Sequence, residues 1–74
     1  MYVIIDTEKT SENIRRLAYQ NNLYAKDLAV ELHVTQMCIY NWLLGNNLPS
    51  IENLIALSIL FSVSINEIIA YELD

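Results

Sequence analysis

One segment of this 74-residue chain, Leu23 to Gly45, constrains its fold more than any other. Apolar residues recur there at helical spacing in two short runs, and residues that favour turns separate the runs. The pattern predicts one helix from about Tyr24 to Leu32 and another from Gln36 to Leu44, joined by a tight turn. The second helix contains no charged residue, and small and polar side chains make up its outer face.

The turn between these two helices has a definite chemistry. His33 stands where the chain needs a positive φ to close the first helix, a conformation that histidine adopts at some cost. Val34 fills the turn, and Thr35 is placed to cap the next helix. The residues of that helix predicted to face inward are Ile39, Trp42 and Leu43.

Caps and apolar stripes predict the remaining elements. Residues 1–8 are β-branched and aromatic with no helical period, so they are expected to form an arm or a short strand. Thr10 or Ser11 is expected to cap the first helix, which ends near residue 21. Ser50 is expected to cap a fourth helix, and Ser64 with Glu67 forms a capping box for a fifth. The sequence therefore predicts five helices around one core.

The chain is rich in apolar side chains for its size. Hydrophobic residues make up 54% of it, with one Gly and one Pro, and a domain this small hides apolar surface poorly. The surplus predicts self-association through the last two helices, although it also fits a core that is simply apolar. The residues expected at this dimer interface are Ile55, Ile59, Ile65, Ile69, Tyr71 and Leu73. Alternatively, the arm at residues 2–5 pairs strand to strand across the dimer.

Several short motifs, each present once, lie at mutually consistent spacings over residues 11–69. They are N-I-R-x-L at 13–17, L-A-x-x-L-x-V at 28–34, T-Q at 35–36, I-x-x-W-x-x-G at 39–45, Pro49, L-x-x-L at 54–57 and F-x-V-S at 61–64. Together they resemble the Cro/cI (Xre) phage-repressor type of helix-turn-helix DNA-binding protein. The resemblance implies a compact, all-α, lambda-repressor-like domain over residues 10–74, preceded by an arm or short strand over residues 1–9.

The resemblance also implies a function. Proteins with this motif insert the second helix of the pair into the major groove of DNA, which here is the predicted helix 36–44. The chain is thus expected to be a transcriptional regulator that binds a near-palindromic operator on double-stranded DNA as a homodimer. Repression is expected rather than activation. The residues expected to contact DNA are Lys26, Thr35, Gln36, Met37, Tyr40, Asn41, Asn46 and Asn47.

These residue types suit base and phosphate contacts. The amide of Gln36 can pair with adenine N6 and N7, and Met37 can pack on a thymine methyl group. Asn41 can pair with a base or a phosphate, and Tyr40 either contacts a phosphate or is a half-buried aromatic at the helix edge. Lys26, with the free N–H groups at the start of its helix, can hold a phosphate.

The charge distribution qualifies this prediction. The net charge is −5, which argues against a broad grip on phosphate. However, no Asp, Glu, Lys or Arg occurs from residue 32 to residue 51. Where the family often has an ion pair between helices, Ala18 and Leu43 are expected to make an apolar contact, with Arg15 on a solvated face. The loop after residue 44 lacks the basic residues frequent in the family, so a shallow salt dependence is expected.

Other classes of protein fit less well. One Cys and one His exclude a four-ligand zinc site, and no cofactor or metal is expected. The chain shows no nucleophile–base pair or phosphate-binding Gly loop, so it is not expected to be an enzyme. No apolar run reaches the length of a membrane helix, and a cytoplasmic location is expected. The alternative is a protein-interaction module of the same fold, such as an antitoxin-like partner or adaptor with little DNA binding.

Overall fold

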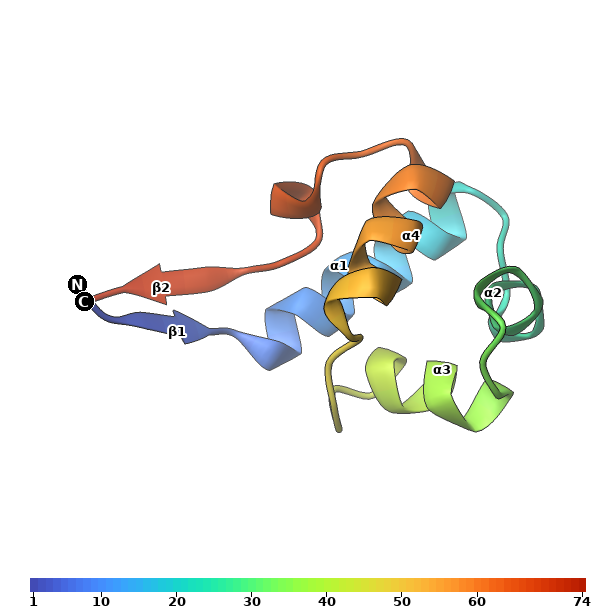
Figure 1. Cartoon of the computed structure of the whole chain (residues 1–74), viewed down its shortest axis with the longest axis horizontal. Coiled ribbons are helices and arrows are strands. Elements are labelled where there is room, and N and C mark those ends of the chain that lie inside the picture. Colours follow the sequence, from blue (N-terminus) through green and yellow to red (C-terminus); the bar gives the residue numbers. More distant parts are fainter.

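The computed structural model describes residues 1–74, and it consists of a helical body with a two-stranded ribbon at one end (Figure 1). In chain order the elements are β1 (Val3–Ile5), α1 (Thr7–Gln20), α2 (Ala25–Leu32), α3 (Gln36–Leu43), α4 (Ile51–Phe61), the 3-10 turn η1 (Ile65–Glu67) and β2 (Tyr71–Leu73). Both termini lie at the free end of the ribbon. The helix-turn-helix pair is α2 and α3.

The turn between α2 and α3 has the chemistry that the sequence predicts. His33 adopts a left-handed conformation with φ 56° and closes α2. The N–H of Val34 then donates to the carbonyl of Ala29 at 3.1 Å, which satisfies one of the orphan carbonyls at the helix end. Thr35 Oγ1 accepts from the N–H of Cys38 at 3.1 Å and caps α3. The predictions for these two caps are confirmed.

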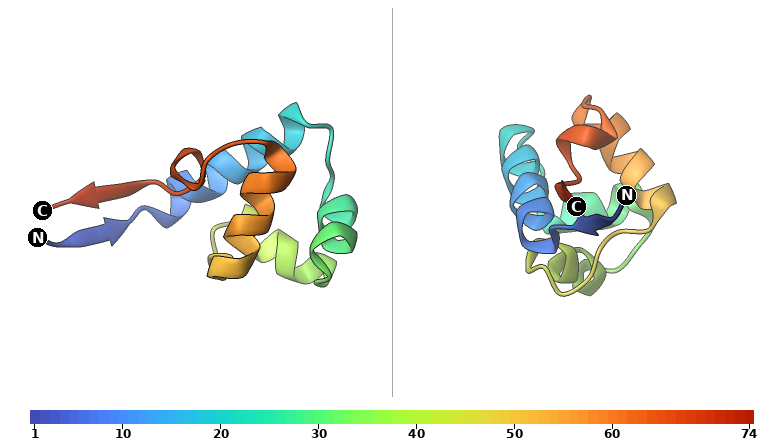
Figure 2. Two further views of the ribbon diagram at one scale, coloured as in Figure 1. Left: turned by 45° about the horizontal axis from the view of Figure 1, so that its top comes forward. Right: turned by 90° about the vertical axis from the view of Figure 1, so that its left-hand side faces the viewer.

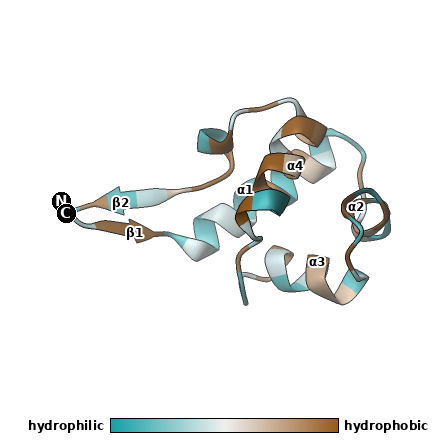
Figure 3. Ribbon diagram, in the orientation of Figure 1, coloured by the Kyte–Doolittle hydropathy of each residue, from teal (hydrophilic) through white to brown (hydrophobic).

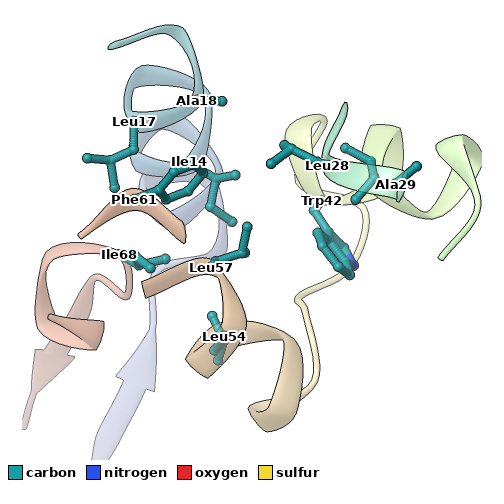
Figure 4. Close-up of a cluster of buried hydrophobic side chains, with 11 residues drawn as sticks. Ile14, Leu17, Ala18, Leu28, Ala29, Trp42, Leu54, Leu57, Phe61 and Ile68 are labelled. Atoms are coloured by element: carbon teal, nitrogen blue, oxygen red, sulfur yellow. The ribbon is translucent and has the colours of Figure 1, made fainter. Parts of the chain in front are cut away.

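A single apolar core holds the helices together, and Figure 4 shows most of it. Side chains from α1 and α4 meet on one side of the core, and side chains from α2 and α3 meet on the other. Trp42 is 3% exposed and Ile39 is fully buried, so their predicted inward orientation is confirmed. The core residues are Ile14, Leu17, Ala18, Leu28, Ala29, Ile39, Trp42, Leu54, Leu57, Phe61 and Ile68.

The prediction of five helices is wrong, because the chain has four α-helices and a small sheet. The expected capping box is present, with the N–H of Ser64 donating to Glu67 Oε2 at 3.0 Å. It starts only the three-residue turn η1, however, and β2 follows. The predicted fifth helix therefore stops after one turn.

Hydrogen bonds to α1 and its cap explain why this helix stops. The carbonyl of Ala70 accepts from the N–H of Asp6 at 2.8 Å, and the N–H of Ala70 donates to Thr10 Oγ1 at 3.0 Å. Asn13 Nδ2 donates to the carbonyl of Ile68 at 3.0 Å. Because these backbone groups are engaged by α1, they are not available to a continuing helix.

The start of α1 also differs from the prediction. Asp6 is the N-cap, and its carboxylate accepts from the N–H of Lys9 at 2.9 Å. Thr10 and Ser11, which were expected to cap the helix, are buried within it. Their hydroxyls serve other bonds, since Thr10 Oγ1 accepts from Ala70 and Ser11 Oγ donates to the carbonyl of Thr7.

The N-terminal residues pair with the other end of the same chain. β1 and β2 are antiparallel, with Val3 opposite Leu73, Ile4 opposite Glu72 and Ile5 opposite Tyr71. The edge of β1 that pairs with β2 is therefore not available for the expected pairing with a second molecule. Figure 2 shows the ribbon leaving the helical body, and Figure 3 shows that β1 is uniformly apolar.

Candidate nucleic-acid interface

The outer face of α3 carries the side chains that the sequence predicts to read DNA. Gln36, Met37 and Tyr40 are exposed, with Met37 69% and Tyr40 48% accessible. Asn41, next along this face, is half-buried. The spacing from residue 36 to residues 37, 40 and 41 places all four on one side of the helix, opposite the buried face. The structure therefore brings these four predicted residues together.

The same face continues to Leu44, which is 71% exposed and was not among the predicted contacts. Its position eight residues after Gln36 adds an apolar side chain at the end of the row. Helical spacing alone could have identified it. Thr35 is also exposed at the start of the row, although its hydroxyl already accepts the capping bond from Cys38.

The loop after α3 folds back on Asn41. Asn46 Nδ2 donates to Asn41 Oδ1 at 3.3 Å, and the N–H groups of Asn46 and Asn47 point to the carbonyl of Asn41 at 2.9 and 3.4 Å. Both loop residues are exposed. With its oxygen engaged, Asn41 presents its NH₂ group, so it is better suited to an acceptor on a base or phosphate than to a bidentate contact with adenine.

The start of α2 is less open to phosphate than the sequence suggested. Lys26 is exposed, but Asp27 Oδ2 accepts from the N–H of Tyr24 at 2.8 Å. This carboxylate lies at the positive end of the helix dipole, where a phosphate would otherwise bind. Lys26 and the Tyr24 side chain, which is 71% exposed, remain available for a phosphate contact.

Arg15 has a structural role that the sequence analysis missed. Arg15 lies on an exposed face, as expected, and its guanidinium also donates to the backbone carbonyl of Leu43 at the end of α3. A cation at this position satisfies an orphan carbonyl and complements the negative end of the helix dipole. Ala18 and Leu43 line one groove beside it. Arg15 thus links α1 to α3 in place of a side-chain ion pair.

Tyrosines surround this groove between α1, α2 and α3. Tyr19, Tyr24 and Tyr40 line it, and each is exposed, so their hydroxyls are available as hydrogen-bond donors. Tyr24 had not been predicted as a contact. Its signal in the sequence is its place directly before α2, where a side chain lies beside the helix start that faces a phosphate in helix-turn-helix proteins.

The acidic residues are concentrated away from α3. Asp6, Glu8 and Glu12 lie at the cap and in the first half of α1, and Glu72 and Asp74 lie in or beside β2. Figure 1 shows that β2 and the start of α1 form the ribbon end of the molecule, whereas α3 is part of the opposite end. The negative net charge is therefore borne mainly by a part of the surface that α3 does not share.

Comparisons with known proteins agree with this geometry. The model of the HTH_3 helix-turn-helix family matches residues 12–68. The chain belongs to this helix-turn-helix family, which confirms the resemblance seen in its motifs.

One curated relative is the HTH-type transcriptional activator BcrR of Enterococcus faecalis. It is 34% identical over 62 residues, which cover 84% of this chain and 30% of the relative. The chain thus spans less than a third of the length of that protein. No solved structure gives a significant match. None of the helices combines the length and apolarity that a membrane crossing requires.

Proposed function

We propose that this protein is a sequence-specific transcriptional regulator that binds a near-palindromic operator as a homodimer, with α3 inserted into the major groove. The observation that carries the proposal is the outer face of α3, which is exposed and uncharged and is backed by the fully buried Ile39 and by Trp42. A rigid helix with such a face can approach base edges without carrying a carboxylate toward phosphate.

Specificity is assigned to the first two turns of α3. Gln36 lies at the first residue of the helix and makes a bidentate contact with adenine. Met37 packs against a thymine methyl group, and Asn41 donates its NH₂ group to a base or phosphate acceptor. Tyr40 belongs to this row and also lines the groove, and its hydroxyl contacts a phosphate.

Backbone contacts are assigned to groups that are mostly neutral. Lys26 and Tyr24 at the start of α2 contact the phosphates on one side of α3. The other contacts with the DNA backbone around α3 are made by Asn46, Asn47 and the exposed Thr35. Neutral donors position a protein on the duplex but release few counterions. Affinity therefore depends on a second copy of the chain bound to the other half-site.

Selection from random duplex DNA tests the proposal. The protein is expected to enrich a sequence made of two related half-sites with centres about 34 Å apart, one turn of DNA. Gln36→Ala is expected to relax the preference at one base position in each half-site, and Asn41→Ala to weaken binding. If no sequence is enriched, or if both variants enrich the same sequence as strongly as the unmodified protein, then α3 does not read DNA.

The same experiment addresses the second candidate function, a protein-interaction module. The exposed apolar side chains on α4 and the ribbon favour it, since Ile59 is 72% and Leu73 is 62% exposed. Failure to enrich DNA, together with retained folding, would support this function instead. The direction of regulation, repression as expected from the sequence or activation as in the named relative, is decided by a reporter gene placed behind the selected operator.

A further inference from the structure

The groove between α1, α2 and α3 is the largest hollow on the molecule, with a volume of about 340 Å³. Its floor is made of small and apolar side chains. They are Ala18, the last core residue of α1 (Figure 4), and the half-buried Leu23 and Leu43. Asn22, which also lines the groove, has a left-handed conformation with φ 56° and turns the chain from α1 toward α2. The volume lies within the range of small-molecule sites.

The rim of this groove is aromatic and carries one cation. Tyr19, Tyr24 and Tyr40 are exposed there, and they come from α1, the N-cap of α2 and α3. Arg15 lies among them, and within the chain its guanidinium bonds to the carbonyl of Leu43. Because a guanidinium carries several N–H donors in a planar fork, donors remain for an acceptor bound in the groove.

The charges around the groove favour an anion. The chain carries nine carboxylate side chains, but none of them lines the groove. Glu12, one turn before Arg15 on α1, is not among the lining residues. The carboxylate of Asp27, the closest along the chain to a lining residue, already accepts from the N–H of Tyr24 at 2.8 Å. The groove is therefore a locally cationic, aromatic site in an acidic protein.

We propose that this groove binds a small aromatic carboxylate. The ring of the ligand packs on the apolar floor and against the tyrosine rings, and its carboxylate accepts charge-assisted hydrogen bonds from Arg15. The ligand site goes beyond the proposed function, but its effect on DNA rests on that function. Tyr24 and Tyr40, assigned above to phosphate contacts, also line the ligand site, so the ligand is expected to weaken operator binding.

A DNA phosphate is a poorer occupant of the groove than an aromatic carboxylate. Seven of the nine lining residues are hydrophobic. A phosphodiester is strongly hydrated, and it loses that hydration without compensation against apolar walls. The tyrosine hydroxyls at the rim can contact a phosphate that stays outside. Ligand and operator are thus expected to use the same two tyrosines through different atoms.

Binding of a matched pair of probes to the full chain, without DNA, tests the site. The probes are para-trifluoromethylbenzoate and para-trifluoromethylbenzamide, which share the ring and differ in charge, and fluorine NMR follows their binding. For a ligand of this size in an open groove, the benzoate is expected to bind with a dissociation constant on the order of 1 mM. The benzamide is expected to bind at least about threefold more weakly, because it cannot pair with the guanidinium as an anion does.

Two neighbouring arginines provide a matched pair of variants. Arg15→Met keeps an apolar stem, removes the cation from the groove and is expected to weaken benzoate binding at least about threefold. Arg16→Met removes the same charge from an exposed side chain of α1 that does not line the groove, and is expected to change it less than about twofold. Because Arg15 also bonds to Leu43, circular dichroism checks the fold of each variant. Ala25→Leu fills the groove without altering either arginine, and it is expected to reduce the binding of both probes.

Several results would overturn the ligand site. They are the absence of benzoate binding up to about 10 mM, ten times the expected dissociation constant, equal binding of the two probes, equal losses in the two arginine variants, and binding unaffected by Ala25→Leu. The first, second and last of these need no change at Arg15.

Operator binding measured with and without the benzoate tests the coupling. At a benzoate concentration equal to its dissociation constant, competition is expected to raise the operator dissociation constant at least about twofold, and the benzamide to raise it less. An unchanged operator affinity would overturn the competition. The two proposals fail separately. Benzoate binding by a chain that enriches no DNA sequence would contradict the proposed function alone, and operator binding without benzoate binding would contradict the ligand site alone.

Discussion

The helix-turn-helix end and the ribbon end of this molecule are held together in different ways. At the first, Leu28 and Ile39 are fully buried and Trp42 nearly so, and specific caps close both helices. At the second, every residue of β1 and β2 is exposed. Tertiary burial thus supports the surface that we propose reads DNA, whereas backbone pairing and a few hydrogen bonds to α1 support the ribbon.

The difference is consistent with the proposal that this acidic protein presents a DNA-binding face. The helix-turn-helix end needs a rigid, well-packed base for α3, and it carries few charges. The carboxylates are concentrated at the ribbon end, away from α3. The net charge of the whole chain therefore does not describe the local charge of either end.

The largest expected effect concerns the packing under α3. Trp42→Ala removes a nearly buried indole and is expected to lower the free energy of unfolding by roughly 3–5 kcal/mol, most of the stability of a small domain. Val3→Ala on the ribbon removes a half-exposed side chain and is expected to cost less than about 1 kcal/mol. Urea denaturation followed by circular dichroism measures both. Equal losses would mean that the two ends are equally supported by packing.

The next largest effect is a loss of operator affinity that leaves the stability of the fold unchanged. Gln36→Ala removes an exposed amide and is expected to weaken binding to the selected operator by about 1–3 kcal/mol, with an unchanged melting temperature. Asn66→Ala removes an exposed amide from η1, on the ribbon side, and serves as the control. Fluorescence anisotropy with a labelled duplex measures both. Comparable losses of operator affinity in the two variants would contradict the assignment of DNA recognition to α3 rather than to the ribbon end.

The smallest effect concerns backbone strain in the turn. His33→Gly relieves a left-handed conformation that costs a histidine roughly 1 kcal/mol, and it is expected to raise stability by less than that amount, because glycine also loses more entropy on folding. Asn22 has the same φ of 56°, and since asparagine tolerates this conformation better, Asn22→Gly is expected to gain less. A melting temperature lowered by His33→Gly would show that the imidazole makes a contact that stabilises the turn.

Local signals account for the parts of the fold that the sequence predicted. The cap at Thr35, the positive φ at His33 and the cap at Ser50, whose Oγ accepts from the N–H of Asn53 at 3.2 Å, each depend on neighbours within three or four residues. Apolar stripes identified the buried faces of the helices for the same reason. The candidate site was predictable to the same extent, since the face of α3 follows from helical spacing alone.

Most of the errors involve partners far apart in the sequence, although the missed cap at Asp6 bonds to Lys9, only three residues away. The fifth helix was predicted from a capping box that does form, but Thr10 and Asn13 engage the backbone after it from 55 to 60 residues away. The pairing of β1 with β2 joins the two ends of the chain, and three-residue strands leave too little alternation to detect. Arg15 reaches the carbonyl of Leu43, a backbone group whose position no side-chain pattern reveals.

The salt dependence of operator binding tests the central claim most directly, namely that an uncharged α3 reads DNA with few ionic contacts. The slope of log K against log salt concentration is about −0.9 for each phosphate that a cation neutralises. With Lys26 as the cation at the interface in each copy, a dimer is expected to give a slope of about −2. A slope of about −6 or steeper would contradict the claim, because the chain would then have to bind DNA through its remaining cations, which lie on α1 outside the face of α3.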